Sequence, residues 1–210
     1  RGEDFSVLVR RVPATANAIM LVDAKALFAS EAAKSGGWQN DREARLQAGL
    51  TSVPPKADKV IIASKLDLAY MRPIWQCALV ESEKPTLIST IARKFGGVLD
   101  KIVGMPAVRL PDNAFIVELN EHLRGGMTPA NRQQVSRWVG LANHDLSPYL
   151  TEAARYTDKT AQVIFALDVT GALTPQEIDH RMGENWDVYR DIVEGAPVKP
   201  MELADLLASM

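Results

Sequence analysis

The segment Ala16-Asn17-Ala18-Ile19-Met20-Leu21-Val22-Asp23 is an apolar run closed by an aspartate, and Ala161-Gln162-Val163-Ile164-Phe165-Ala166-Leu167-Asp168 resembles it 145 residues later. A short, continuous apolar run is typical of a strand that is covered on both faces. The same offset matches Arg10 with Arg155 and Thr15 with Thr160, and a slightly larger one matches Trp38 with Trp186 and Arg42 with Arg190. The sequence therefore predicts an internal duplication with one such strand in each copy.

The elements of the first copy follow from local patterns. Glycine pairs at 36–37 and 96–97 end two helix-like segments, and Pro111-Asp112-Asn113 is a turn sequence between two strand-like segments. In chain order the patterns predict a strand that ends at Asp23, helices over 24–34 and 38–50, a hairpin over 59–66 and 73–81, a helix over 86–95, a hairpin over 100–110 and 114–119, and a helix with Thr128 as N-cap and Pro129 at its first position. This order predicts an α+β fold with a largely antiparallel sheet, helices packed on one face and ferredoxin-like connectivity.

The second copy is predicted to be partial. Residues 1–143 form the first α+β module, and residues 144–210 hold a helix over 146–156, the repeated strand and helices that begin near Thr174 and Met201, all packed on the first module. The sequence stops before counterparts of the hairpins and of the final helix. Because an unpaired strand edge invites association, we expect the repeated strand to join the first sheet or to pack against it.

The composition describes a globular chain without a strong electrostatic field. Of 210 residues, 47% are hydrophobic and 24% are charged, and the net charge is −2 with a pI near 6.0. This balance gives no basic excess to attract nucleic acid or an anionic membrane, so no nucleic-acid partner is predicted. No apolar run approaches the roughly 20 residues that cross a bilayer, so no membrane span is predicted.

The compartment is not fixed by the sequence. The single cysteine, Cys77, excludes an intramolecular disulfide and a cysteine-based zinc cluster, and we interpret it as a small core residue. The first residue is Arg rather than Met. Removal of an upstream secretory signal, which would place the protein in the periplasm or outside the cell, is one explanation among several.

Sequence motifs for catalysis, cofactor binding and metal binding are missing. The chain has no His-Glu-x-x-His, Cys-x-x-Cys, Gly-x-Ser-x-Gly or Gly-Lys-Ser pattern and no dinucleotide fingerprint. Glu118 and His122 would lie about 13 Å apart on a strand, too far to share a metal ion. Ser136, His144 and Asp145 lack the setting of a nucleophile. We therefore predict no catalytic, cofactor-binding or metal-ligating residue, and the sequence leans against an enzyme.

Asp23 and Asp168 are candidate contacts for a ligand or a partner, because both copies keep a carboxylate at the end of the strand. Two carboxylates brought together by pseudo-symmetry could bind a cation or share a proton. The alternative, which we favour, is that each one caps the following helix by accepting backbone N–H groups. Trp38 and Trp186 are likewise interpreted as packing residues rather than as stacking platforms.

Arg124, Arg132 and Arg137 are further candidates, since they surround the predicted helix start at Thr128. The unpaired N–H groups of a helix start, together with guanidinium groups, can hold an anion or the carboxylate of a partner. The alternative, a solvated basic face, is favoured because scattered surface charges contribute little.

Three segments carry a resemblance to a known family: Val12-Pro13-Ala14-Thr15-Ala16-Asn17 before the first strand, the stretch 97–104 before a hairpin, and Met127-Thr128-Pro129-Ala130-Asn131-Arg132-Gln133 at a helix start. Together they resemble an uncharacterised family of duplicated proteins from planctomycete-type bacteria. The resemblance implies that further strands follow a helix similar to 203–210. It implies no activity, cofactor or functional residue.

Two hypotheses for function follow. The first is a non-enzymatic interaction or scaffolding module of a bacterial protein, which binds a protein partner or associates with itself through an open sheet edge. The second is a ligand-binding protein or an enzyme of unrecognised type that uses the groove between the two copies. The absence of catalytic motifs favours the first.

Overall fold

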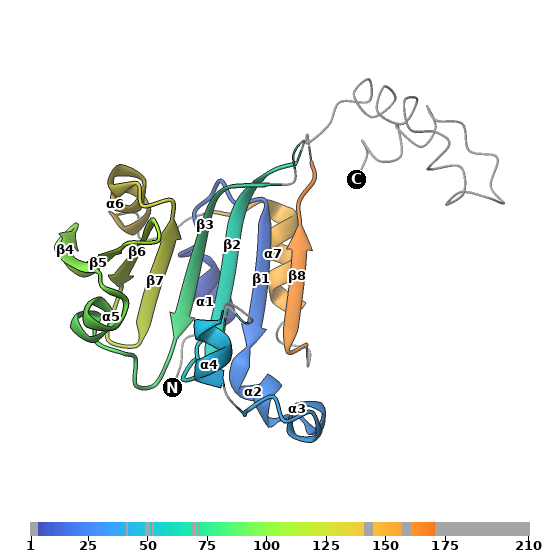
Figure 1. Ribbon diagram of the computed structural model, residues 1–210. Helices are drawn as coiled ribbons and strands as arrows, with labels where there is room; N and C mark the ends of the chain where they lie inside the picture. The colour runs from blue at the N-terminus through green and yellow to red at the C-terminus, as the bar shows by residue number, and fades with distance from the viewer. Residues whose placement is uncertain are drawn as a thin grey trace. The chain divides into compact units, whose positions relative to one another are not determined.

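The computed structural model describes residues 4–40, 42–48, 51, 53–68, 70, 72–140, 145–156 and 161–170. The chain divides into two compact units, one of residues 1–66 and 73–167 and the other of residues 67–72 and 168–210. The first unit contains the β-sheet and the helices that pack on it (Figure 1).

The elements agree largely with the predicted ones. Within the described residues the helices are α1 Phe5–Val9, α2 Ala24–Ala29, α3 Glu31–Ser35, α4 Arg42–Gln47, α5 Ile88–Phe95, α6 Arg132–Gly140 and α7 Pro148–Arg155. The strands are β1 Ala18–Asp23, β2 Lys59–Asp67, β3 Arg72–Glu81, β4 Val98–Ile102, β5 Met105–Leu110, β6 Ala114–Glu118, β7 Leu123–Thr128 and β8 Val163–Leu167. Both segments of the apolar repeat are strands, and both predicted hairpins are present. The predicted helices over 174 onwards and 201–210 lie outside the described residues.

The strands form one sheet in the order β4-β5-β6-β7-β3-β2-β1-β8. The pairs β1–β2, β1–β8, β3–β7, β4–β5, β5–β6 and β6–β7 are all antiparallel. This confirms an α+β fold with a largely antiparallel sheet. The connectivity is that of two meanders, β1–β2–β3 and β4–β5–β6–β7, joined where β3 pairs with β7, and it differs from the ferredoxin-like connectivity that we expected.

Local backbone geometry explains the difference in connectivity. Val103 and Gly104 both have positive φ, 50° and 80°, and they make a tight turn that divides the expected strand 100–110 into β4 and β5. The strand β7 was not predicted, because its sequence Leu-Arg-Gly-Gly-Met-Thr contains two glycines, which are depleted in strands, and only one β-branched residue. These two extra strands produce a four-stranded meander in place of a simple hairpin.

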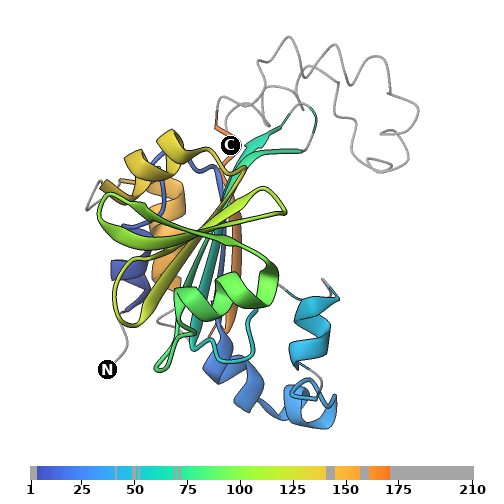
Figure 2. The ribbon, with the colours of Figure 1, turned by 60° about the vertical axis from the view of Figure 1, so that its left-hand side comes forward.

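The main core lies between the sheet and the helices α1, α6 and α7, which cover one face (Figure 2). Leu8 of α1 and Leu150 of α7 are almost fully buried there, against Ile19, Leu21 and Ile61 of the central strands. Two smaller apolar clusters lie on the opposite face, one under α2 beside β1 and β2 and one under α5 beside β5 and β6. Alternate side chains of each strand thus enter different clusters, as the pleat requires.

Side-chain caps start α2, α3, α6 and α7, and for α2 and α6 they test a prediction made from the sequence. Asp23 accepts the N–H of Ala26 at 2.8 Å and caps α2, as we predicted. The prediction for α6 was wrong: the helix begins at Arg132, and Asn131 accepts the N–H of Gln134 at 3.1 Å. Thr128 instead ends β7, and it is joined to Pro129 by a cis peptide bond. Pairing with β3 holds Thr128 in the sheet, so it is not available as a helix cap.

The repeated strand joins the sheet of the first module, which was one of the two arrangements expected for it. Strand β8 pairs with β1 from Ala18 opposite Leu167 to Val22 opposite Val163, and the N–H of Asp23 donates to the carbonyl of Gln162 at 2.9 Å. Helix α7 packs on β1 and β8 from the core face. The compact unit therefore includes α7 and β8, which the sequence assigns to the second copy.

Candidate functional site

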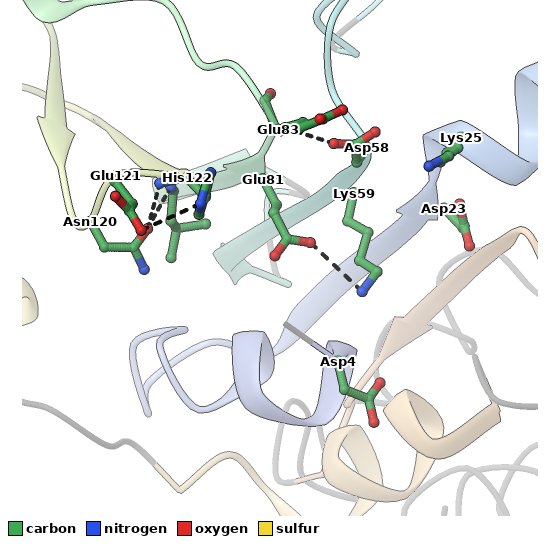
Figure 3. A pocket seen from close by; sticks show the side chains of 12 residues that line it. Asp4, Asp23, Lys25, Asp58, Lys59, Glu81, Glu83, Asn120, Glu121 and His122 are labelled. Atoms are coloured by element: carbon green, nitrogen blue, oxygen red, sulfur yellow. Dashed lines mark hydrogen bonds and ion pairs between the residues drawn. The ribbon is translucent and has the colours of Figure 1, made fainter. Parts of the chain in front are cut away.

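A pocket of about 940 Å³ lies at one end of the sheet, where β1 and β3 end and β2 begins (Figure 3). The start of α1, the β6–β7 turn and the segment after β3 complete its wall. Its lining is mainly charged and polar and consists of Asp4, Asp23, Lys25, Asp58, Lys59, Glu81, Ser82, Glu83, Asn120, Glu121, His122 and Leu123. Adjacent strand ends thus bring together charges that are far apart in the chain.

An ion pair between Lys59 and Glu81 lies inside the pocket. The Lys59 Nζ is 3.6 Å from a carboxylate oxygen of Glu81, whose side chain is only 5% exposed (Figure 3). The ammonium group also lies 5.4 Å from the centre of the Phe5 ring. A buried carboxylate is costly unless it is paired, so Lys59 compensates Glu81 within the fold. Local sequence patterns did not predict this pair, although one residue begins and the other ends a strand of the same predicted hairpin.

The remaining carboxylates in the pocket are partly used by the backbone. Asp58 accepts the N–H of Glu83 at 2.8 Å, and Asp23 caps α2. Ser82, the hydroxyl residue of the lining, is held by its own N–H, which donates to the carbonyl of His122 at 3.0 Å. His122 Nε2 lies 3.5 Å from a Glu121 oxygen. The excess of carboxylates suits a basic group better than an anion.

The pocket does not assemble a metal centre or a nucleophile from the described residues. Across the part of the chain that the structure describes, no three His, Cys, Asp or Glu side chains converge on a point where they could hold a metal ion. Glu118, which lies four positions before His122 in the sequence, pairs with Arg124 at 3.2 Å. The lone cysteine, Cys77, is buried in the core, where desolvation raises the pKa of its thiol to about 12. That thiol is unsuited to nucleophilic chemistry.

The two candidate aspartates occupy separate compact units. Asp23 closes β1 and lines the pocket. Asp168 belongs to the second unit, where its side chain accepts the N–H of Thr170 at 2.9 Å. Both carboxylates therefore bind a backbone N–H just after the apolar run, which agrees with the favoured capping interpretation for Asp23 and with a similar local role for Asp168. Trp38 is 41% exposed and does not belong to the core, and Trp186 lies outside the described residues.

The three candidate arginines do not converge on one site. Arg124 is buried, donates to the Asn120 carbonyl at 2.6 Å and pairs with Glu118, and its desolvation lowers its pKa. Arg132 pairs with Asp100 of β4 through two hydrogen bonds of 2.9 and 3.2 Å. Arg137 is exposed on α6. Two of the three guanidinium groups thus tie elements of this chain together.

The edge of the sheet formed by β8 is the second candidate site. Within the described ranges, the strand pairs on one side with β1, and no strand is paired with its other side. Its sequence, Val-Ile-Phe-Ala-Leu, has no charge, proline or glycine, and the Phe165 side chain is 67% exposed. The opposite edge strand, β4, carries Asp100 and Lys101 in its centre. Charges and proline are the usual protection of an edge strand, and β8 has neither.

Comparisons with known proteins identify no family for this chain. No family model matches the chain, and no curated protein matches it. Solved structures of crystal forms I and IV of TP0453 are similar at 12% sequence identity, with TM-scores of 0.46 and 0.42. Each match covers 79% of this chain, but only 62% and 64% of the respective TP0453 chain. The chain thus spans less than two thirds of the length of the structures that it resembles.

Among the helices of the described residues, none is both long enough and apolar enough to cross a membrane.

Proposed function

We propose that this chain is a non-enzymatic protein-interaction module that binds an extended segment of a protein partner along the outer edge of β8. The observation that carries the proposal is the unprotected state of this edge: an uncharged strand with an exposed phenylalanine at its centre. An extended segment that adds to a sheet edge gains main-chain hydrogen bonds, while side chains on alternate positions supply specificity.

The backbone of β8 is arranged for strand addition. In an antiparallel pair, hydrogen-bonded and non-hydrogen-bonded residue pairs alternate. Since Asp23 donates to Gln162, the even-numbered residues Ile164 and Ala166 direct their N–H and C=O groups towards β1. Val163, Phe165 and Leu167 therefore direct theirs outwards. Each of these three residues can exchange two backbone hydrogen bonds with a partner strand, which gives up to six.

The side chains of the edge support the same proposal. Val163 is 47% exposed and Phe165 is 67% exposed, and alternation places them on one face of the sheet. Ile164 and Ala166 point to the other face and pack into the main core. A bound strand would cover the apolar groups of Val163 and Phe165, which is favourable at about 25 cal/mol per Å² of apolar surface removed from water.

The alternative function, a ligand-binding protein or an enzyme with a groove between two copies, has less support. Every residue that lines the pocket lies between Asp4 and Leu123, so the pocket belongs to the first module by itself. Its best-buried carboxylate, Glu81, is paired with Lys59. The pocket therefore offers a charged hollow without an arranged set of reacting groups.

Selection of displayed peptides tests the proposal. A library of extended decapeptides is selected on the wild-type chain and then screened against Phe165→Lys, which places a charge on the edge, and against Leu87→Lys. Leu87 is the matched control, because it is an equally exposed apolar residue, at 63%, beside α5 and far from β8 in the sheet order. We expect the enriched peptides to alternate β-branched residues, to lose binding to Phe165→Lys and to keep binding to Leu87→Lys. Peptides that ignore both changes, or no enrichment at all, would contradict the proposal.

A further inference from the structure

The register in which β1 pairs with β8 is symmetric with respect to the sequence repeat. The 145-residue offset maps Ala18–Val22 onto Val163–Leu167, which are the bounds of β8. In the sheet, Met20 lies opposite Phe165, its own counterpart in the repeat. Ile19 lies opposite Ala166, the counterpart of Leu21, and Leu21 lies opposite Ile164, the counterpart of Ile19. The pair of strands is thus related by a local two-fold axis through the Met20–Phe165 pair.

The same axis relates the outer edges of the two strands. Ala18, Met20 and Val22 direct their backbone groups away from β8 and towards β2, where their partners are Ser64, Ile62 and Val60. Their counterparts in β8 are Val163, Phe165 and Leu167, the residues that direct their backbone groups outwards. The outer edge of β8 therefore presents the backbone pattern to which β2 binds in β1.

The counterparts in β1 and β8 differ in exposure. Strand β1 has β2 on its outer side, whereas β8 has no strand there in the described residues. Val22 is 3% exposed and Met20 is half-buried, because β2 and α2 pack beside them. Phe165, the counterpart of Met20, is 67% exposed, and Val163 is 47% exposed. In the described residues β8 has the apolar face of β1 without the strand and helix that cover it.

From these observations we infer that the strand accepted by β8 has the pattern of β2 and belongs to a second module of the same build, so that one sheet continues through both modules. The inference rests on the proposed function and names its partner. Applying the 145-residue offset to the β1–β2 register places the Ile62 position of the incoming strand opposite Phe165. The Ser64 position lies opposite Val163, and the Val60 position lies opposite Leu167.

The first experiment measures binding of a peptide with the nine-residue sequence of Lys59–Asp67 to the full chain. A peptide of the same composition in scrambled order is the control. We expect the β2 peptide to slow amide exchange at Val163, Phe165 and Leu167, while Ile164 and Ala166 are already protected by β1. Binding to Phe165→Lys should be weaker by at least about tenfold, since a charge on an edge opposes strand addition.

The second experiment determines the register by disulfide trapping. The chain carries Phe165→Cys, and its native Cys77 does not interfere because it is buried. Three versions of the peptide carry cysteine at the position of Val60, Ile62 or Ser64. We expect the Ile62 version to cross-link preferentially, since directly opposed residues bring their Cα atoms within the range that a disulfide spans.

The outcomes separate this inference from the proposed function. If selected peptides bind the β8 edge but the β2 peptide binds no better than its scrambled control, the partner is wrong and the interaction module stands. If Phe165→Cys forms mainly a disulfide-linked homodimer, the occupant is a second β8, and the inference is overturned. If no extended peptide binds the edge, both proposals fail.

Discussion

Substitution of Gly125 by alanine is predicted to destabilise the protein, because this glycine lets α6 approach the sheet. A Cβ atom at Gly125 would lie 2.6 Å from Cη2 and 3.3 Å from Cζ2 of Trp138, and 2.9 Å from Cδ1 of Leu119. Trp138 has little room to move. Its indole is 5% exposed and its Nε1–H donates to the Arg11 carbonyl at 2.6 Å, which links α6 to the segment after α1.

The magnitude follows from three contributions. Overpacking of a filled core costs about 1–3 kcal/mol. Displacing the indole weakens its buried hydrogen bond to Arg11, which adds about 1 kcal/mol. Alanine is more favourable than glycine in a strand by about 0.5–1 kcal/mol, which offsets part of the cost. The expected net loss for Gly125→Ala is about 2 kcal/mol.

The next residue of the same strand provides a matched control. A Cβ at Gly126 would meet only the Phe115 carbonyl oxygen, at an ordinary contact distance of 3.8 Å. Neither glycine has a positive φ, so alanine is compatible with the backbone at both positions. Gly126→Ala should therefore be neutral or stabilising by up to about 1 kcal/mol.

Urea unfolding followed by circular dichroism measures both variants. With a slope of about 2 kcal/mol per M, the midpoint of Gly125→Ala should fall by about 1 M, while that of Gly126→Ala should stay or rise. In a double-mutant cycle, Trp138→Phe should reduce the cost of Gly125→Ala, because the clashing ring atoms are removed. Equal midpoints for the two alanine variants, or independent effects of Gly125→Ala and Trp138→Phe, would refute the packing argument.

Three further predictions concern single side chains. Asp23→Ala removes the cap of α2 and should lower the free energy of unfolding by about 1 kcal/mol, measured by urea denaturation, with Asp23→Asn retaining most of it. Cys77 should not react with a thiol reagent at pH 8 in the native protein and should react fully in urea, since burial raises the pKa of its thiol to about 12; rapid native labelling would contradict its burial. Arg132 lowers the pKa of Asp100 through side-chain hydrogen bonds, so this interaction stabilises the fold above the unfolded pKa of about 3.9 and is lost as the pH falls through the lower folded pKa. Thermal melts should therefore show a smaller acid-induced loss for Asp100→Asn than for the wild type between about pH 5 and pH 2.

Local sequence patterns predicted much of the secondary structure, and their failures have local causes. Apolar runs located β1, β8 and the first hairpin, and Gly96 ends α5 in the left-handed conformation, as the glycine pair indicated. The start of α6 was misplaced because Thr128 and Asn131 are both good caps, and only pairing of Thr128 with β3 decides between them. Strand β7 escaped prediction because glycines are depleted in strands, and the need for Gly125 arises from its contact with Trp138, which is distant in the sequence.

The candidate sites were predictable only in part. The sequence predicted an open sheet edge and the capping role of Asp23. It did not predict that Arg124 and Arg132 are paired with Glu118 and Asp100, which removes them from a common anion site. Whether a charged side chain is free to bind a ligand depends on its partners in the fold, and Asp100 lies 32 residues from Arg132 in the chain. Such distant partners leave no periodic signal in a single sequence.

The sequence by itself determined most of the strands, the turn between β5 and β6, the cap of α2 and the similarity of β1 to β8, because each of these depends on residues within a few positions or on direct comparison of segments. Only the tertiary structure decided that β3 lies beside β7, that β8 pairs with β1 about a two-fold axis, and that Lys59 and Glu81 meet inside a pocket. The physical reason is that sheet neighbours are chosen by burial and hydrogen bonding over the whole unit, which local preferences do not encode. The outer edge of β8, on which the proposed function depends, is a product of that global choice.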